Sequence, residues 1–181
     1  MKVLAVLGSP RRSKNTAKLL NNYLDELQMK FEEAEITQIF VGDGSISPCM
    51  GCSTCKTSSE KKCVIDDDMQ KYYPEILECD ILVLATPVYW FNMTTQLKSF
   101  IDRFYAFDYS KLSSQKKVVL LTTFGAADKV LSGAINIENS ITGITQFLKL
   151  DFVHHIGVTA VDVTLAGINT MLSKKIDEIV S

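Results

Sequence analysis

The sequence has no long hydrophobic run and no excess of charge of one sign. The apolar run after Asp80 is broken near Thr86 and Pro87, short of the roughly 18 apolar residues of a membrane span. The chain has 19 Lys and Arg against 21 Asp and Glu, a formal net charge of −2. No global basic field therefore exists to hold a nucleic-acid backbone or an anionic membrane. We expect no nucleic-acid and no membrane partner, and any anion site must be local.

Glycine and proline are also scarce, at nine and four residues, while hydrophobic residues make up 46% of the chain. This composition excludes the disordered and collagen-like classes. A length of 181 residues favours a single domain over residues 1–181. The apolar stretch 3–7 is too short for a signal-peptide core of about 7 to 15 residues, and Arg11 follows soon after it. We therefore expect a cytoplasmic protein.

Short apolar runs alternate with amphipathic segments along the chain. Residues 3–7, 81–85 and 118–121 are continuous apolar runs, typical of parallel strands covered on both faces. Helical spacing of apolar residues recurs in the segments between the runs and after the last of them. Further strands are expected at 36–41 and 153–163, and helices at 20–27, 69–76, 97–104, 137–148 and 168–179.

This alternation predicts an α/β fold, a flavodoxin-like doubly wound sheet of five parallel strands with helices on both faces. The expected strand order is 2-1-3-4-5. Ligands of such sheets bind at the carboxyl ends of the strands, where the winding reverses. The loops after Leu7, Ala85 and Leu121 are therefore the first places to look for a site. A long segment without periodicity, at about 42–66, holds four of the five cysteines.

The loop between the first strand and the first helix has the chemistry of a phosphate site. Hydroxyls, guanidinium groups and the N–H groups of a helix start come together over residues 8–16. The loop lacks the G-x-x-x-x-G-K-[ST] and G-x-G-x-x-G spacings, so a terminal monophosphate fits better than a triphosphate or a dinucleotide. The alternative is that Asn15 or Thr16 only caps the helix and the cations lie in solvent.

Two further loops could hold a flat ring. After the third strand, Tyr89, Trp90 and Phe91 are consecutive aromatics, suited to a planar heterocycle. Alternatively, Trp90 and Phe91 cover a dimer interface or cap the core. After the fourth strand, residues 122–126 offer hydroxyls and a glycine that permits close backbone approach.

The cysteines of the long segment read C-x2-C-x2-C-x7-C, at Cys49, Cys52, Cys55 and Cys63. Three thiols three residues apart resemble the wrapping of a cubane cluster in bacterial ferredoxins, and Cys63 could close the same cluster. Structural zinc is a rival, although it usually uses two close pairs with a longer separation. The acidic residues 66–68 are expected to cap the next helix. We assign no chemistry to Cys79, His154 or His155.

At these residues the chain resembles the flavodoxin-like NAD(P)H-dependent FMN reductase superfamily, and its cysteine loop resembles the iron-sulfur flavoprotein branch. G-S-P-R followed by N-T is similar to that superfamily's phosphate loop, and T-P-V-Y-W to its isoalloxazine loop. The implied cofactor is FMN. The implied phosphate contacts are Ser9, Arg11, Ser13, Asn15 and Thr16, with Arg12 less clearly placed. The implied ring contacts are Pro87, Val88, Tyr89, Trp90, Phe91 and Asn92, with Thr123 and Gly125 opposite.

The resemblance implies a [4Fe-4S] cluster held by Cys49, Cys52, Cys55 and Cys63, which would exchange electrons with FMN. The expected donor is a ferredoxin-like protein or NAD(P)H, the acceptor a small molecule, and the assembly a homodimer or homotetramer. No catalytic side chain is expected, because the redox chemistry belongs to the flavin. One alternative is an NAD(P)H-dependent FMN or quinone reductase whose cysteine loop holds free or redox-active thiols. A second is a non-enzymatic, flavodoxin-like electron carrier.

Overall fold

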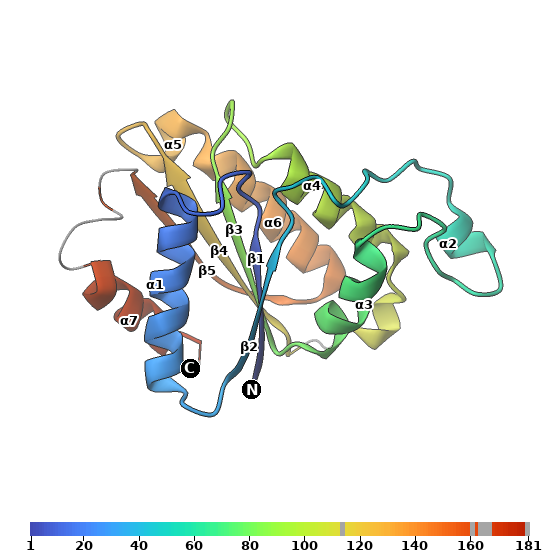
Figure 1. The fold of residues 1–181 in the computed structure, drawn as a ribbon, viewed down its shortest axis with the longest axis horizontal. Helices are drawn as coiled ribbons and strands as arrows, with labels where there is room; N and C mark the ends of the chain where they lie inside the picture. Colours follow the sequence, from blue (N-terminus) through green and yellow to red (C-terminus); the bar gives the residue numbers. More distant parts are fainter. Residues whose placement is uncertain (113–114, 160–161, 163–167, 180–181) are drawn as a thin grey trace.

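The computed structural model describes residues 1–112, 115–159, 162 and 168–179. Its five strands form one parallel sheet in the order β2-β1-β3-β4-β5. The predicted fold and strand order are therefore confirmed (Figure 1). The strands are β1 (Lys2–Leu7), β2 (Glu35–Phe40), β3 (Ile81–Pro87), β4 (Lys117–Phe124) and β5 (Asp151–Thr159).

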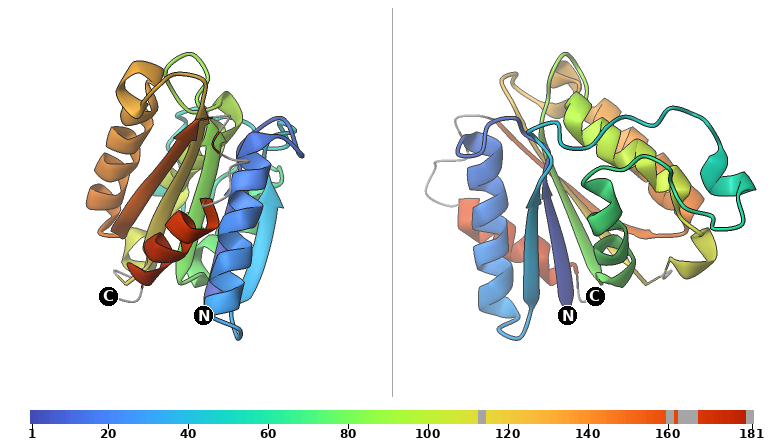
Figure 2. Two further views of the ribbon diagram at one scale, coloured as in Figure 1. Left: turned by 90° about the vertical axis from the view of Figure 1, so that its left-hand side faces the viewer. Right: turned by 45° about the vertical axis from the view of Figure 1, so that its right-hand side comes forward.

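Helices cover both faces of this sheet (Figures 1 and 2). The fifth strand begins at Asp151, two residues before the expected start, and residues 160–161 and 163 of its expected end lie outside the described residues. Two four-residue helices, α2 and α5, were not expected. The helices are α1 (Asn15–Lys30), α2 (Thr54–Thr57), α3 (Met69–Glu78), α4 (Thr95–Asp102), α5 (Lys129–Ser132), α6 (Ala134–Leu148) and α7 (Ile168–Asp177), with 3-10 turns η1 (Arg103–Ala106) and η2 (Tyr109–Lys111).

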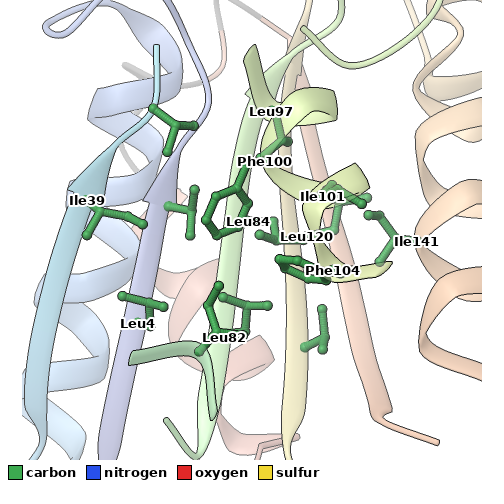
Figure 3. Packing of buried hydrophobic residues seen from close by; sticks show 14 of the residues in the cluster. Leu4, Ile39, Leu82, Leu84, Leu97, Phe100, Ile101, Phe104, Leu120 and Ile141 are labelled. Atoms are coloured by element: carbon green, nitrogen blue, oxygen red, sulfur yellow. The ribbon is translucent and has the colours of Figure 1, made fainter. Parts of the chain in front are cut away.

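The alternation of side chains along β1 divides the core into two layers. Val3, Ala5 and Leu7 pack with α1 and α7 on one face. Leu4 and Val6 pack with α3, α4 and α6 on the other face, where Phe100 and Phe104 of the α4 region lie over β3 and β4 (Figure 3). Both faces of the central strands are thus buried, as the continuous apolar runs predict.

The carboxyl ends of β1, β3 and β4 meet at one edge of the sheet, and backbone contacts tie them together. The N–H of Gly8 donates to the carbonyl of Ala85 at 2.8 Å, and the N–H of Val88 donates to the carbonyl of Thr123 at 2.9 Å. A Cβ at Gly8 would lie 2.7 Å from the Cβ of Leu97, so only glycine permits this approach of the first loop to α4.

The segment between β2 and α3 leaves the sheet and carries α2 away from the body of the domain (Figure 1). It contains the four clustered cysteines. In the part of the chain that the structure describes, no helix is both long and apolar enough to cross a bilayer.

Candidate functional site

A cavity of about 300 Å³ opens at the carboxyl edge of the sheet, within the size range of small-molecule sites. All three loops singled out from the sequence line it. Nine of the predicted cofactor contacts take part: Ser9, Arg11, Asn15, Thr16, Pro87, Val88, Tyr89, Thr123 and Gly125. Lys14 and Phe124 also line the cavity and were not predicted, whereas Ser13, Trp90, Phe91 and Asn92 do not line it.

The first loop is shaped by Ser9, whose buried Oγ accepts a hydrogen bond from the N–H of Arg11 at 3.1 Å. Helix α1 begins at Asn15, and its N-cap residue, Lys14, makes no side-chain capping hydrogen bond. The positive end of the α1 dipole therefore faces the cavity beside the Arg11 side chain. This arrangement suits a dianionic phosphate.

Thr16 connects the phosphate loop to the end of β4. Its Oγ1 lies 2.7 Å from Oγ1 of Thr123, and both side chains are buried. Thr16 is therefore a tie between two walls of the cavity and not the cap of α1. The neighbouring Arg12 turns away from the cavity, because its guanidinium lies 3.7 Å from the ring centre of Phe40 and 3.3 Å from a carboxylate oxygen of Asp43.

Beyond Tyr89 the second loop forms a tight hairpin that projects past the sheet edge (Figure 1). The backbones of Tyr89 and Asn92 exchange two hydrogen bonds, of 2.8 and 3.1 Å. Trp90 and Phe91 between them both have left-handed φ angles, of 45° and 66°. A two-residue turn of this kind normally uses Asn-Gly, so two bulky aromatics here indicate strain that other contacts must offset.

The α5–α6 corner holds this hairpin. Asn136 donates from Nδ2 to the carbonyl of Phe91 at 3.1 Å. A Cβ at Gly133 would lie 2.5 Å from Cα of Phe91, so glycine is needed for the close packing. Trp90 remains 93% exposed. The predicted contacts of Trp90 and Phe91 with a bound ring thus stay a prediction.

A partly buried polar chain connects this corner to the sheet. His155 Nδ1 lies 3.1 Å from a carboxylate oxygen of Glu138, and Nε2 lies 2.7 Å from Oγ1 of Thr122. Lys129 of α5 donates to the same Glu138 oxygen at 2.8 Å. Burial lowers the pKa of His155, although Glu138 opposes the shift. The neutral imidazole then donates to the carboxylate and accepts from the threonine, which gives His155 a structural role.

The four clustered cysteines line one small pocket beside η1. Cys49 and Cys52 are exposed, Cys63 is half-buried and Cys55 is buried. Hydrogen bonds with Thr54 lower the pKa of the Cys52 thiol, while burial raises the pKa of Cys55. Within the described residues, no three Cys, His, Asp or Glu side chains are close enough together to hold a metal ion.

The four cysteine thiols of this pocket fit an iron-sulfur cluster better than a single zinc ion. Tetrahedral zinc would need four sulfurs about 3.8 Å apart, given a Zn–S bond of about 2.3 Å. A cubane places each cysteine on a different iron and so tolerates a wider spread of sulfurs. Four thiols around one pocket therefore match the predicted cluster in type and number, although their side chains must converge to bind it.

An ion pair that the sequence did not reveal fixes the root of the cysteine loop. Arg103 Nη1 donates to Asp67 Oδ2 at 2.7 Å and to the carbonyl of Ser47 at 3.0 Å. Asp67 also accepts from the N–H of Ser47 and from the N–H of Met69, at the start of α3. Burial raises the pKa of Asp67, but the hydrogen bonds from Arg103, Ser47 and Met69 and the charge of Arg103 together outweigh it and leave that pKa below its usual value.

Asp67 therefore meets the expectation that residues 66–68 act at the helix start, and it also joins the two ends of the loop. Asp68, the N-cap residue of α3, makes no capping hydrogen bond and lies 3.1 Å from Lys71. No sequence period connects Asp67 with Arg103, which lie 36 positions apart.

Lys56 fixes the outer part of the loop. Its Nζ donates to the carbonyl of Phe107 at 2.8 Å and lies 4.1 and 5.0 Å from the ring centres of Tyr109 and Tyr105. Because Lys56 follows Cys55 in α2, these contacts hold α2 against the 3-10 turns that follow α4.

Lysines gather on the outer side of the cysteine pocket. Two adjoining hollows of about 230 and 440 Å³ border Cys55 and Cys63, respectively. Their lining includes four lysines, Lys56, Lys61, Lys62 and Lys111, and two carboxylates, Glu60 and Asp108. This lysine groove is locally cationic in a chain whose net charge is −2.

Comparison with known proteins agrees with this geometry. Residues 1–148 match the model of the NADPH-dependent FMN reductase family. An iron-sulfur flavoprotein of Archaeoglobus fulgidus is 41% identical over 57% of this chain and 45% of its own length. An iron-sulfur flavoprotein of Methanosarcina thermophila is 32% identical over 70% of this chain and 61% of its own length.

A solved azoreductase structure from Bacillus anthracis superposes with a TM-score of 0.70 at 14% identity, covering 99% of this chain and 96% of that one, which supports the fold. The chain spans between 45% and 61% of the length of the two curated relatives named above. The resemblance noted from the phosphate and isoalloxazine loops is confirmed, together with its iron-sulfur flavoprotein branch. The chain belongs to the NADPH-dependent FMN reductase family.

Proposed function

We propose that this chain is an FMN-dependent oxidoreductase whose cysteine loop carries a [4Fe-4S] cluster that exchanges electrons with the flavin. The single observation that carries the FMN assignment is the cavity at the sheet edge. It brings together the phosphate loop, the aromatic loop and the end of β4, which are far apart in the sequence. Family membership points to the same cofactor.

In this proposal the residues of the cavity bind and orient FMN, whose ring supplies one- and two-electron chemistry when bound. Arg11, the hydroxyl of Ser9 and the α1 N-terminus hold the phosphate. Val88 and Tyr89 wall the ring and exclude water from one side. No side chain is required to move a proton, so no catalytic residue is assigned.

Two adjacent arginines provide a matched test of FMN binding. Arg11 lines the cavity, whereas Arg12 faces Phe40 and Asp43. Arg11→Ala should weaken FMN binding by about 1.5 to 3 kcal/mol, the range for a hydrogen bond to a charged group. Riboflavin, which lacks the phosphate, should bind both variants and the unmodified chain alike. Equal FMN affinities for Arg11→Ala and Arg12→Ala, measured by fluorescence titration, would contradict the phosphate assignment.

The cluster is supported by four thiols around one pocket and by the names of the relatives. Cys52→Ser should lose iron and retain FMN, because the cavity and the cysteine pocket have no lining residue in common. Cys79→Ser is the matched control, since Cys79 lies buried outside the pocket. Iron unchanged in Cys52→Ser would exclude the cluster ligand set.

The electron donor that we propose is an acidic, ferredoxin-like protein. The lysine groove borders two of the proposed cluster ligands, and its cationic character complements an acidic surface. Lys61→Glu with Lys62→Glu should slow reduction by such a protein and leave reduction by dithionite unchanged. The alternative donor is NAD(P)H, and the acceptor is a small molecule. Rapid oxidation of NAD(P)H by an iron-free, FMN-loaded chain would favour the cluster-free reductase.

We also propose a homodimer or homotetramer, supported by the exposed aromatic tip of the hairpin. Trp90 and Phe91 lie exposed at this tip, and Val130 and Leu131 are exposed in α5, beside the corner that holds it. Trp90→Ser should weaken self-association in sedimentation experiments. A mass unchanged by this substitution over a concentration series would argue against an interface at the tip.

We also propose a cytoplasmic location, because a chain with five cysteine thiols suits a reducing compartment.

A further inference from the structure

Arg103 is a charged residue in the interior of the domain. The residue is 1% exposed. Its Nη1 donates to Asp67 and to Ser47, and Nη2 lies 3.4 Å from the carbonyl of Ile65. Within the described residues, its Nε is buried without a hydrogen-bond partner. Leaving such a donor unpaired is costly, so the Nε–H group is free to donate to a further acceptor.

The ion pair is oriented relative to the cysteines. Arg103 lines the same pocket as Cys49, Cys52, Cys55 and Cys63, whereas Asp67 does not line it. The carboxylate that does line it, Asp102, is paired with Lys98. The positive end of the pair between Arg103 and Asp67 is therefore nearer to the four thiols than the negative end. The side chain of Arg103 is fully buried and that of Asp67 is 9% exposed, so solvent screens the pair weakly.

The cysteine pocket needs a positive charge when it is loaded. Four thiolates carry four negative charges, and the iron and sulfide core of a cluster offsets only part of them. Reduction adds a further electron to this anionic group. A nearby buried cation therefore stabilises the reduced form more than the oxidised form. Net charge and hydrogen bonds to sulfur are among the factors that set cluster potentials.

We propose that Arg103 is the charge-compensating residue of the cysteine pocket, and that it raises the reduction potential of the bound cluster. Its Nε–H supplies a hydrogen bond to a cysteine sulfur, and Asp67 holds the guanidinium in place and partly offsets its charge. This inference rests on the proposed cluster. It assigns to Arg103 a role beyond joining the two ends of the loop.

Substitutions on the two sides of the ion pair distinguish this role from a purely structural one. Arg103→Gln removes the positive charge and should lower the cluster potential. Asp67→Asn removes the offsetting negative charge and should raise it. Arg103→Lys retains the charge without Nε and should lower the potential less than Arg103→Gln. If the ion pair were only a structural contact, the two substitutions would not shift the cluster potential in opposite directions, because loss of either side chain breaks the same contact.

The experiment uses the full chain, loaded with FMN and purified without oxygen. Iron and acid-labile sulfide are measured first, and the midpoint potential is then titrated while the reduced cluster is followed by electron paramagnetic resonance. Tyr109→Leu is the control, because it loosens the outer part of the loop at its contact with Lys56 without changing the ion pair or any charge near the thiols. Its potential should match that of the unmodified chain. If Arg103→Gln fails to fold, Arg103→Lys and Asp67→Asn still give the two signs.

The outcomes separate the inference from the function on which it rests. Potentials shifted in opposite directions by Arg103→Lys and Asp67→Asn support it. A full complement of iron with unshifted potentials, or with shifts of one sign, overturns the role of Arg103 and leaves the cluster intact. A chain that binds FMN and holds no iron or sulfide after reconstitution overturns the cluster and this inference together, while the FMN assignment remains.

Discussion

The FMN cavity and the cysteine loop are built in different ways. The cavity lies where three parallel strands end, and backbone hydrogen bonds between Gly8 and Ala85 and between Val88 and Thr123 join its walls. The cysteine loop leaves the sheet, and side chains tie it down, chiefly Arg103 at its root and Lys56 farther out. The fold itself therefore shapes the first site, whereas a few long side chains position the second.

Loss of Arg103 should give the largest effect, because it removes one half of a buried ion pair. Arg103→Ala leaves the carboxylate of Asp67 without its partner and should reduce the free energy of unfolding by about 3 to 5 kcal/mol. Lys98→Ala breaks the exposed pair with Asp102 and should cost about 0.5 kcal/mol or less. Urea unfolding measures both. Similar losses for the two variants would show that the root of the loop is not fixed as described.

Acid should affect the surroundings of His154 in β5 and the cysteine loop at different pH. Burial lowers the pKa of His154, in β5, to about 4, below the 6.5 of an unfolded histidine. Protons then bind the unfolded chain first, and stability is lost as the pH falls from about 6.5 to 4, by at most about 1.4 kcal/mol per pH unit and proton.

Asp67 has a lowered pKa, so the stability that it contributes persists until the pH falls below the value of an unfolded carboxyl, about 3.9. Urea unfolding measured at a series of pH values should therefore show that the free energy of unfolding already falls above pH 4. The substitution His154→Gln should make this decrease smaller. Exchange of the amide hydrogens of the cysteine loop, corrected for the pH dependence of exchange in an unfolded chain, should stay slow until Asp67 is protonated. Early opening of the loop, near pH 6, would contradict the separation of these two titrations.

Thr123→Val should have an intermediate effect, on the cavity alone. It leaves the buried hydroxyl of Thr16 without its partner, at a cost of about 1 to 3 kcal/mol in the free energy of unfolding. FMN affinity should fall with it, because α1 and β4 are no longer tied. Thr145→Val is the control, since its hydroxyl bonds only to carbonyls of α6. Iron content should not change in either variant, and iron loss in Thr123→Val would couple the two sites.

Lys56→Met should have a smaller effect on global stability than Arg103→Ala or Thr123→Val, about 0.5 to 1.5 kcal/mol for one hydrogen bond with its aromatic contacts. The methionine retains the apolar stem, so the change isolates the ammonium group. Local opening of α2 should be larger, measured as faster exchange of its amide hydrogens. Exchange unchanged in α2 would show that Lys56 does not hold the loop.

The sequence predicted those features of the fold and the site that depend on the local pattern of residues. The apolar runs of β1 and β3 predicted a parallel sheet, and the expected strand order then placed the loops after Leu7 and Ala85 at one edge. The hydroxyls and arginines of the first loop indicated its chemistry. Cysteine spacing indicated one shared pocket, and all four cysteines do line one pocket.

Features that depend on distant contacts could not be predicted in this way. Trp90 and Phe91 adopt left-handed angles, and their tip is held by Gly133 and Asn136, more than 40 positions away. The pairing of Asp67 with Arg103 likewise has no periodic signal. The direction of Arg12, away from the cavity, depends on Phe40 and Asp43 in the neighbouring strand and loop.

The most direct test of the two-site account is the cofactor content of one sample purified without oxygen. Iron, acid-labile sulfide and FMN are measured per chain, before and after cluster reconstitution. The account predicts about four iron, four sulfide and one FMN, as a [4Fe-4S] cluster and one flavin require. FMN without iron or sulfide after reconstitution would contradict it and leave a flavin reductase with a cysteine-rich loop.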